Sequence, residues 1–180
     1  MKKEKLYKGK LFELNAYHMQ VEHRKIRREI IEHPGAAAML AFDEKGKVLL
    51  VKQHRFPHGY ILEIPAGTLE KKEKPIDCAY REIIEETGYE AKKMTKLISY
   101  FPSVGYNKEE IHIFVASGTK KKFELKLDHD EFITVVKMDI KKLIGMIKSG
   151  KIIDSKTICA VMIYAAKKNY CNTLLITWFN

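Results

Sequence analysis

The sequence predicts a domain of the α+β or layered α/β class. Short apolar runs with the composition of strands recur along the chain between positions 36 and 136. Segment 75–88 begins with a proline and ends with a glycine, as helices often do, and segments 140–148 and 155–167 are also helical in pattern. A mixed order of strands and helices is typical of a layered domain.

The N-terminal residues 1–33 are expected to add strands in front of this domain. Segment 6–21 is rich in residues that favour strands, and a turn is expected at 24–25. Segment 26–32 would then return as a second strand, and the Pro-Gly pair at 34–35 would end it. We therefore expect a small additional N-terminal β-sheet.

The main domain is expected to begin with a hairpin and to continue on both sides of its first helix. Residues 43–46, Asp-Glu-Lys-Gly, have the composition of a hairpin loop between two apolar runs. Pro75 suits the first position of a helix, Gly88 suits its C-terminal cap, and Asp154 or Ser155 is expected to cap the last helix. Strands are expected at 36–42, 48–51, 60–64, 96–101, 111–116 and 132–136.

The net charge of +10 at pH 7 and a pI near 9.4 indicate a surface that attracts anions. The lysines are scattered in short runs, such as 71–72, 92–93 and 120–122, and no nucleic-acid-binding motif accompanies them. A solvated lysine-rich surface explains these runs, so we expect no nucleic acid as a partner. The charge also suits a small phosphorylated substrate.

Cysteine spacing and hydropathy both favour a cytoplasmic protein without a membrane partner. Cys78, Cys159 and Cys171 form no zinc-binding or closely paired pattern, as expected of reduced thiols. No segment approaches the roughly 18 apolar residues of a membrane span, and the basic N-terminus leads into no signal sequence.

The helix expected over 75–88 carries three glutamates on one face. At about 100° per residue, Glu82, Glu85 and Glu86 fall on one arc, where like charges three and four residues apart repel one another. Carboxylate oxygens are hard ligands that suit magnesium, manganese or calcium, so a divalent cation would neutralise this arc. The alternative is a solvated acidic face beside Arg81. The opposite arc is apolar and is expected to face the core; it holds Ile76, Ala79, Tyr80, Ile83 and Ile84.

The loop before this helix favours a metal site over a solvated acidic face. Segment 67–89 fits, without a gap, the pattern of glycine, five residues, glutamate, seven residues, arginine-glutamate-apolar, one residue, glutamate-glutamate, one residue, glycine, apolar. The matching residues are Gly67, Glu73, Arg81, Glu82, Ile83, Glu85, Glu86, Gly88 and Tyr89. This pattern is the Nudix box, and the chain resembles the Nudix hydrolases. The resemblance implies their α+β fold, in which a mixed β-sheet is layered between helices as an α/β/α sandwich.

Further segments resemble the bacterial and archaeal ADP-ribose pyrophosphatases within that family. They are 28–29 with 32–35, 50–55, 62–67, 102–106 with Glu109, and 150–152 followed by a capped helix. The resemblance extends to about Lys168 and implies metal-dependent hydrolysis of the diphosphate of ADP-ribose to AMP and ribose 5-phosphate.

Two alternatives to this activity stay open. Val104 stands where the subfamily often has a proline, which leaves another nucleoside diphosphate sugar, or a dinucleotide, as the substrate. A Nudix-like module that only binds nucleotide belongs to a different class of function. Such modules commonly lack the box glutamates, whereas all of them are present here.

The resemblance also implies roles for individual residues. Glu82, Glu86 and Glu85, with the backbone carbonyl of Ala66, would hold Mg²⁺, or Mn²⁺ in its place, and Arg81 would orient the glutamates. Residues with a structural role would be Gly67, Glu73 and Gly88. Residues that contact the substrate would be Arg28, Arg55, Gly105 and Glu109. Guanidinium groups suit phosphate oxygens, although surface positions on strands are the alternative for both arginines.

A general base is expected on the loop at 128–131, where the subfamily often has a glutamate. His129 stands opposite that glutamate and has an ordinary pKa near neutrality, whereas Glu131 lies two residues further on and has the reach of the family base. The third option is that bound metal ions activate the water without a base.

Residues 1–180 are expected to form one Nudix domain, with the box at 67–89. In the resembling subfamily the N-terminal region helps to form an intertwined homodimer whose substrate is held by both subunits. Residues 1–33 are therefore expected to mediate a homodimer with Arg28 near a shared site, and the role of the tail 169–180 stays open.

Overall fold

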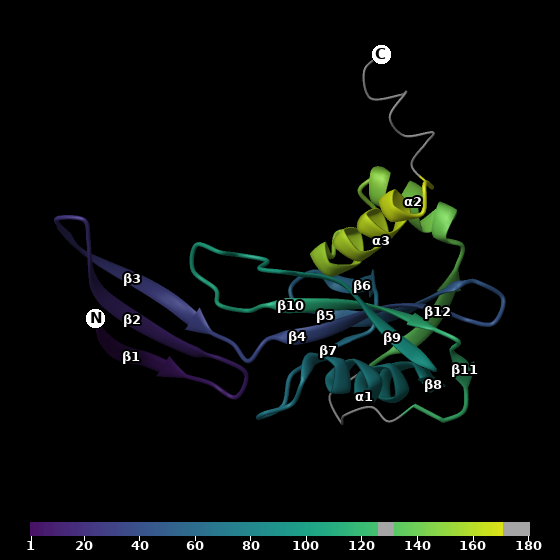
Figure 1. The fold of residues 1–180 in the computed structure, drawn as a ribbon, viewed down its shortest axis with the longest axis horizontal. Coiled ribbons are helices and arrows are strands. Elements are labelled where there is room, and N and C mark those ends of the chain that lie inside the picture. Colours follow the sequence, from purple (N-terminus) through teal and green to yellow (C-terminus); the bar gives the residue numbers. More distant parts are fainter. Residues whose placement is uncertain (126–131, 171–180) are drawn as a thin grey trace, which may run out of the picture.

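The computed structural model describes residues 1–125 and 132–170, and within them it confirms the predicted α+β architecture. A mixed sheet lies between α1 (Pro75–Thr87) on one face and α2 (Ile140–Lys148) with α3 (Ser155–Lys167) on the other (Figure 1). The predicted base residues His129 and Glu131, and the tail from position 171, lie outside the described residues.

The main sheet has the strand order β12-β5-β4-β10-β9, with β6 paired to β5 and β7 paired to β4. β10 runs parallel to β4, and the other strand pairings of this sheet are antiparallel. The sheet is therefore mixed, as predicted. Its strands are β4 (Ala36–Phe42), β5 (Val48–Arg55), β6 (Gly59–Glu63), β7 (Ala66–Thr68), β9 (Lys93–Tyr100), β10 (Ile111–Ser117) and β12 (Thr134–Met138). The short strands β7, β8 (Tyr89–Glu90) and β11 (Lys120–Lys121) were not predicted, because two or three residues carry no periodicity.

β4 is buried on both of its faces, which explains its uninterrupted apolar sequence. Ala38 and Leu40 pack into the core beneath α2 and α3, whereas Ala37 and Met39 pack into the core beneath α1. Successive side chains of a strand point to opposite faces, so this one strand joins the two cores. The layer of helices on each side is therefore fixed to a common central element.

The three predicted helices are confirmed, with ends close to those expected. Pro75 occupies the first turn of α1, and Gly88 caps the helix in the left-handed conformation, with φ of 72° and its N–H donated to the Ile84 carbonyl. Asp154 caps α3 by accepting a hydrogen bond from the Thr157 N–H at 2.9 Å. None of the helices in residues 1–125 and 132–170 is long and apolar enough to cross a membrane.

The N-terminal sheet has three strands where two were predicted. They are β1 (Lys2–Lys8), β2 (Glu13–Val21) and β3 (Arg24–Glu32), paired antiparallel in that order. A turn closed by the Gly9 N–H and the Phe12 carbonyl, 2.9 Å apart, divides the segment expected as one strand. The turn predicted at 24–25 is wrong: the chain reverses at Glu22, whose φ of 53° allows the turn two residues earlier.

This N-terminal sheet projects from one end of the main body (Figure 1) and is attached through the end of β3. The Ile31 N–H donates to the Tyr106 carbonyl, and the Ile31 carbonyl accepts from the Lys108 N–H at 3.0 Å. The Glu32 carboxylate accepts hydrogen bonds from the Tyr17 hydroxyl and, at 2.9 Å, from the Lys108 ammonium. The loop between β9 and β10 is thereby bound to the projecting sheet.

Candidate active site

A cavity of about 540 Å³ brings together seven of the twelve predicted site residues that the structure describes. The predicted residues that line it are Arg55, Ala66, Gly67, Arg81, Glu82, Glu86 and Glu109. They come from α1, from β5, from the short strand β7 and from the loop before β10. Residues far apart in the sequence therefore share one concave surface, as ligand sites commonly do.

One wall of the cavity is acidic and belongs to α1. Ala79 and Ile83 fasten this helix to the core, as the apolar arc predicted, whereas Ile76 at the first turn is exposed. Glu86 is only 3% exposed although it carries a carboxylate. Its Oε2 accepts a hydrogen bond from the Ala66 N–H at 2.9 Å, which ties the helix to β7. Glu82 and Glu86 of the acidic arc are thus built into the cavity wall, whereas Glu85 lies beside it.

Arg81 balances much of the charge on this wall. Its guanidinium holds Glu73 through two hydrogen bonds of 2.9 and 3.0 Å, Glu85 through one of 3.0 Å, and Glu82 through a further ion pair. The hydrogen bond to Glu73, followed by the charges of its neighbours, raises the pKa of the Arg81 guanidinium, so it is always charged. Charged hydrogen bonds of this kind are strong, and the orienting role of Arg81 stays a prediction.

Gly67 is required by the closeness of α1. A Cβ atom added to this residue would overlap the Glu82 carboxylate, so any other side chain would displace that group. The absence of a side chain lets the backbone of β7 lie against the acidic wall. This is the tight approach of loop and helix that the sequence predicted.

The donor set of this wall fits a hard divalent cation by its chemistry. Carboxylate and backbone carbonyl oxygens are the ligands that Mg²⁺ and Mn²⁺ prefer, and they line the cavity at Glu82, Glu86 and Ala66. Within residues 1–125 and 132–170, no three acidic, histidine or cysteine side chains already converge as a ligand group. The ion pairs to Arg81 account for this at Glu82 and Glu85, since they draw both carboxylates toward the guanidinium.

The cavity lining also carries charged residues that the sequence did not indicate as site residues. Lys156, from the first turn of α3, lines the cavity together with Asp154 and forms ion pairs with Glu63 and Asp154. Glu63 also accepts a hydrogen bond from Nε of Arg55 at 2.8 Å. Glu63 and Lys156 lie 93 positions apart in the chain, so spacing alone could not show their pairing. The helix cap predicted at Asp154 was the one available signal.

Glu109 belongs to a small polar group at the end of β10. Its carboxylate accepts a hydrogen bond from the Asn107 amide at 3.2 Å and lies 3.8 Å from Nδ1 of His33. His33 Nδ1 itself accepts the Gly35 N–H at 3.1 Å, which fixes the ring at the cavity edge. His33 lines the cavity and was not predicted as a site residue.

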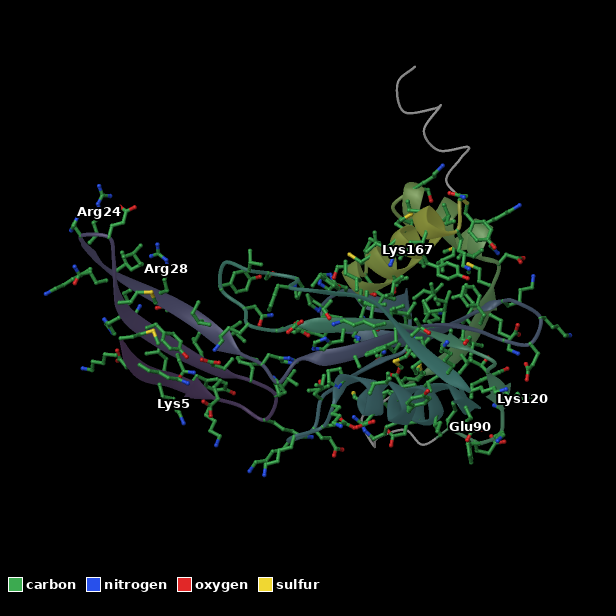
Figure 2. The ribbon with its side chains drawn as sticks, viewed as in Figure 1. Lys5, Arg24, Arg28, Glu90, Lys120 and Lys167 are labelled. Atoms are coloured by element: carbon green, nitrogen blue, oxygen red, sulfur yellow. The ribbon has the colours of Figure 1, made fainter. Side chains whose placement is uncertain are left out.

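Two predicted substrate contacts lie away from this cavity in a single chain. Arg28 is exposed on β3 of the projecting sheet, far from α1 (Figure 2), and donates a hydrogen bond to the neighbouring Arg27 carbonyl. Gly105 is exposed on the loop between β9 and β10 and does not line the cavity. Among the other predicted residues, Glu73, Glu85 and Gly88 support α1 without lining the cavity.

The bond between Glu73 and Arg81 predicts a specific loss of stability in acid. The Arg81 hydrogen bonds hold the pKa of Glu73 below its ordinary value of 4.5. A carboxyl group whose pKa is lowered by folding stabilises the protein above the unfolded value and loses that contribution as the pH falls through the folded value. Glu73→Gln should therefore lower the unfolding temperature at neutral pH and make its decline below about pH 4.5 shallower.

The measurement is thermal unfolding followed across acidic and neutral pH. Glu44→Gln, which removes an exposed glutamate from the hairpin loop, serves as the control and should keep the wild-type profile. Coincident curves for wild type and Glu73→Gln over the whole range would show that this ion pair contributes nothing to stability.

The sequence is similar to one protein family and to several named proteins. A family profile described as the NUDIX domain matches residues 32–161. The ADP-ribose pyrophosphatase of Bacillus subtilis is 39% identical over 169 residues, which cover 92% of this chain and 91% of that protein. The methanol dehydrogenase activator of Bacillus methanolicus is 40% identical over 89% of both chains. The GDP-mannose pyrophosphatase of Yersinia enterocolitica is 36% identical over 73% of both.

The fold has a counterpart among solved structures. The crystal structure of an ADP compounds hydrolase superposes with a TM-score of 0.77 over 97% of this chain and 94% of that one, at 16% sequence identity. At 16% identity, this similarity supports only the fold. The family match covers every residue that lines the cavity except Leu11, and the chain belongs to the NUDIX family.

Proposed function

We propose that this NUDIX enzyme hydrolyses the diphosphate of ADP-ribose to AMP and ribose 5-phosphate in the presence of Mg²⁺, with Mn²⁺ as a substitute. The observation that carries the proposal is a cavity that combines an acidic wall on α1 with the cationic residues Arg55 and Lys156. A diphosphate site needs both. The acidic wall would hold metal ions, and the phosphate oxygens bind such ions as well as cationic side chains. The similarity to a named ADP-ribose pyrophosphatase supports this substrate.

Glu82, Glu86 and Glu85, with the Ala66 carbonyl, would hold the metal. Bound divalent ions would offset the negative charge of the diphosphate and lower the pKa of a water molecule. Arg81 contributes by gathering Glu82 and Glu85 on one side of the helix, and the Ala66 N–H fixes Glu86. The chain itself thus supplies the orientation of the acidic wall.

The rest of the cavity suits a nucleotide conjugate. Its volume of about 540 Å³ lies within the roughly 300–1,000 Å³ range of small-molecule sites. Arg55 would bind phosphate oxygens, and the Glu109 carboxylate at the other end would accept hydrogen bonds from a ribose hydroxyl. The predicted base, His129 or Glu131, lies outside the described residues and stays a prediction, as does activation of water by metal alone.

A substrate panel tests the proposal. ADP-ribose, GDP-mannose, another sugar nucleotide, a dinucleotide and a nucleoside triphosphate would be compared at saturating Mg²⁺ by kcat/KM, with products identified. We expect ADP-ribose to give the highest value. A clear preference for GDP-mannose would favour the second candidate, which the similarity to a GDP-mannose pyrophosphatase and the valine at position 104 support. Binding without turnover of any compound would favour a nucleotide-binding module.

A homodimer is the proposed assembly, and it would explain the position of Arg28. The projecting sheet exposes apolar side chains at Leu6, Tyr7 and Val21, which a second subunit would cover. Arg28 would then reach a site shared between subunits, although it lies away from the cavity of its own chain. We expect a dimer by light scattering at micromolar concentration, and Arg28→Ala should raise KM for ADP-ribose. A fully active monomer would contradict this assembly.

The proposed setting is the cytoplasm. Cys78 and Cys159 are free thiols in the structure, and burial raises the pKa of the Cys78 thiol to about 12, which makes it unreactive. Thiols of this kind suit a reducing compartment.

A further inference from the structure

Three charged residues of the cavity lining, Asp154, Lys156 and Arg55, are joined through the buried carboxylate of Glu63. We define the charge relay as Asp154, Lys156, Glu63 and Arg55, in that order. The Lys156 ammonium lies 2.8 Å from Oδ1 of Asp154 and forms an ion pair with Oε2 of Glu63, whose Oε1 accepts from Nε of Arg55 at 2.8 Å. The relay joins the start of α3 to β6 and β5, and two of its members line the cavity as cations.

Glu63 is the centre of the relay and cannot be balanced by solvent. Its side chain is 1% exposed, whereas those of Lys156 and Arg55 are 13% and 45% exposed. A buried carboxylate is costly unless cations and hydrogen-bond donors satisfy both oxygens. Lys156 takes one oxygen and Arg55 takes the other, so neither cation alone completes the set.

This division leaves part of the Arg55 guanidinium available. Arg55 uses Nε for Glu63, and within residues 1–125 and 132–170 its two terminal nitrogens have no hydrogen-bond partner. Those nitrogens form the flat fork that suits two phosphate oxygens. If Lys156 did not hold the second oxygen of Glu63, the guanidinium could form two parallel hydrogen bonds with the carboxylate. This stronger pair would draw a terminal nitrogen of Arg55 toward Glu63.

Hydrogen bonds fix the first turn of α3, which carries Lys156. Oδ2 of Asp154 accepts the Thr157 N–H, and the Thr157 hydroxyl accepts the Ile64 N–H, both at 2.9 Å. Thr157 is completely buried, so the first turn of α3 is fixed to the residue that follows Glu63. The ammonium therefore has a set position relative to the carboxylate.

We propose that Lys156 is a positioning residue of the diphosphate site, which holds Glu63 so that the terminal nitrogens of Arg55 stay directed at the substrate. The inference rests on the proposed function for the role of Arg55. It assigns to α3, at the far end of the sequence from the NUDIX box, a part in binding the substrate. Lys156 acts on Arg55 through the Glu63 carboxylate, so its proposed role requires no direct contact with the substrate.

The test compares steady-state kinetics of Lys156→Met, Lys156→Arg and a control, Lys167→Met, at saturating Mg²⁺. Lys167 is exposed near the other end of α3 (Figure 2) and lies outside the cavity. We expect Lys156→Met to raise KM for ADP-ribose about tenfold while kcat changes about twofold at most, as for loss of a ground-state contact with a charged group. Lys156→Arg should restore most of the affinity, and Lys167→Met should match wild type.

A double-mutant cycle with Arg55→Met distinguishes positioning from contact. If Lys156 acts through Arg55, adding Lys156→Met to Arg55→Met should change KM by less than about twofold. Losses that multiply in the double variant would mean that Lys156 touches the diphosphate itself, and would overturn the relay. An unchanged KM in Lys156→Met would overturn it as well.

Two further measurements keep the test decisive. Should Lys156→Met fail to fold, Lys156→Met with Glu63→Gln leaves no buried charge unpaired and should unfold near the wild-type temperature. It should still show the raised KM, because Nε of Arg55 then lacks the carboxylate that anchors it, and a wild-type KM would overturn the relay. Titration calorimetry with ADP, which is a diphosphate, reads the same site without turnover. Weaker ADP binding in Lys156→Met supports the relay even if ADP-ribose is not the substrate, whereas unchanged binding overturns it.

Discussion

Replacing Glu86 with glutamine should lower ADP-ribose hydrolysis by at least about a hundredfold at saturating Mg²⁺, the range for loss of a main electrostatic element of a site. Glutamine keeps the shape of the side chain, and its carbonyl oxygen can still accept the Ala66 N–H that Glu86 accepts at 2.9 Å. The local structure should therefore persist while the negative charge needed to hold a divalent cation is lost. Glu82→Gln should have a similar effect.

The matched control is Asp77→Asn, which removes an exposed carboxylate from the first turn of the same helix. It should leave kcat/KM close to wild type and cost only a fraction of a kcal/mol of helix stability, roughly 0.3–1 kcal/mol. Wild-type turnover by Glu86→Gln, with its fold confirmed by circular dichroism, would remove Glu86 from the proposed metal site.

Gly67→Ala should have the second large effect, although it adds only a methyl group. The new Cβ would overlap the Glu82 carboxylate, so either Glu82 leaves its position or the backbone of β7 moves away from α1. Both changes disturb the acidic wall, and we expect kcat/KM for ADP-ribose to fall by about a hundredfold, comparable to the direct loss of a charged group.

Gly145→Ala gives the comparison for this prediction. Gly145 lies in α2, where a Cβ would meet nothing within 4 Å. Alanine is favoured over glycine inside a helix by about 1 kcal/mol, so this variant should unfold at a higher temperature and keep its activity. Equal activities of Gly67→Ala and Gly145→Ala would show that the close approach of β7 to Glu82 does not matter for catalysis.

Local signals predicted the main elements of the fold well. Pro75 and Gly88 marked the ends of α1 because proline fits only the first turn and glycine readily adopts the left-handed cap. The apolar run of β4 also showed a strand, and its burial on two faces explains the lack of alternation. The sequence could not show the extra break at 9–12, because a turn there depends on hydrogen bonds and not on periodicity.

The candidate site was predicted on one wall and largely missed on the other. The box residues, such as Gly67, Arg81 and Glu82, lie close together along the chain, so their spacing reflects their geometry. Lys156 and Glu63 meet only because α3 packs next to the end of β6, a contact that no local pattern contains. Arg28 matched a family position, yet the cavity of a single chain does not include it.

The cavity lined by α1 and the start of α3 should support metal-dependent cleavage of a nucleoside diphosphate sugar. The most direct measurement follows ADP-ribose by ³¹P NMR with the purified protein, in Mg²⁺ and again after a chelator removes it. We predict that the diphosphate signals are replaced by those of equal amounts of AMP and ribose 5-phosphate, and that conversion stops with the chelator. Unchanged diphosphate signals in Mg²⁺, or conversion that continues at full rate in the chelator, would contradict the account.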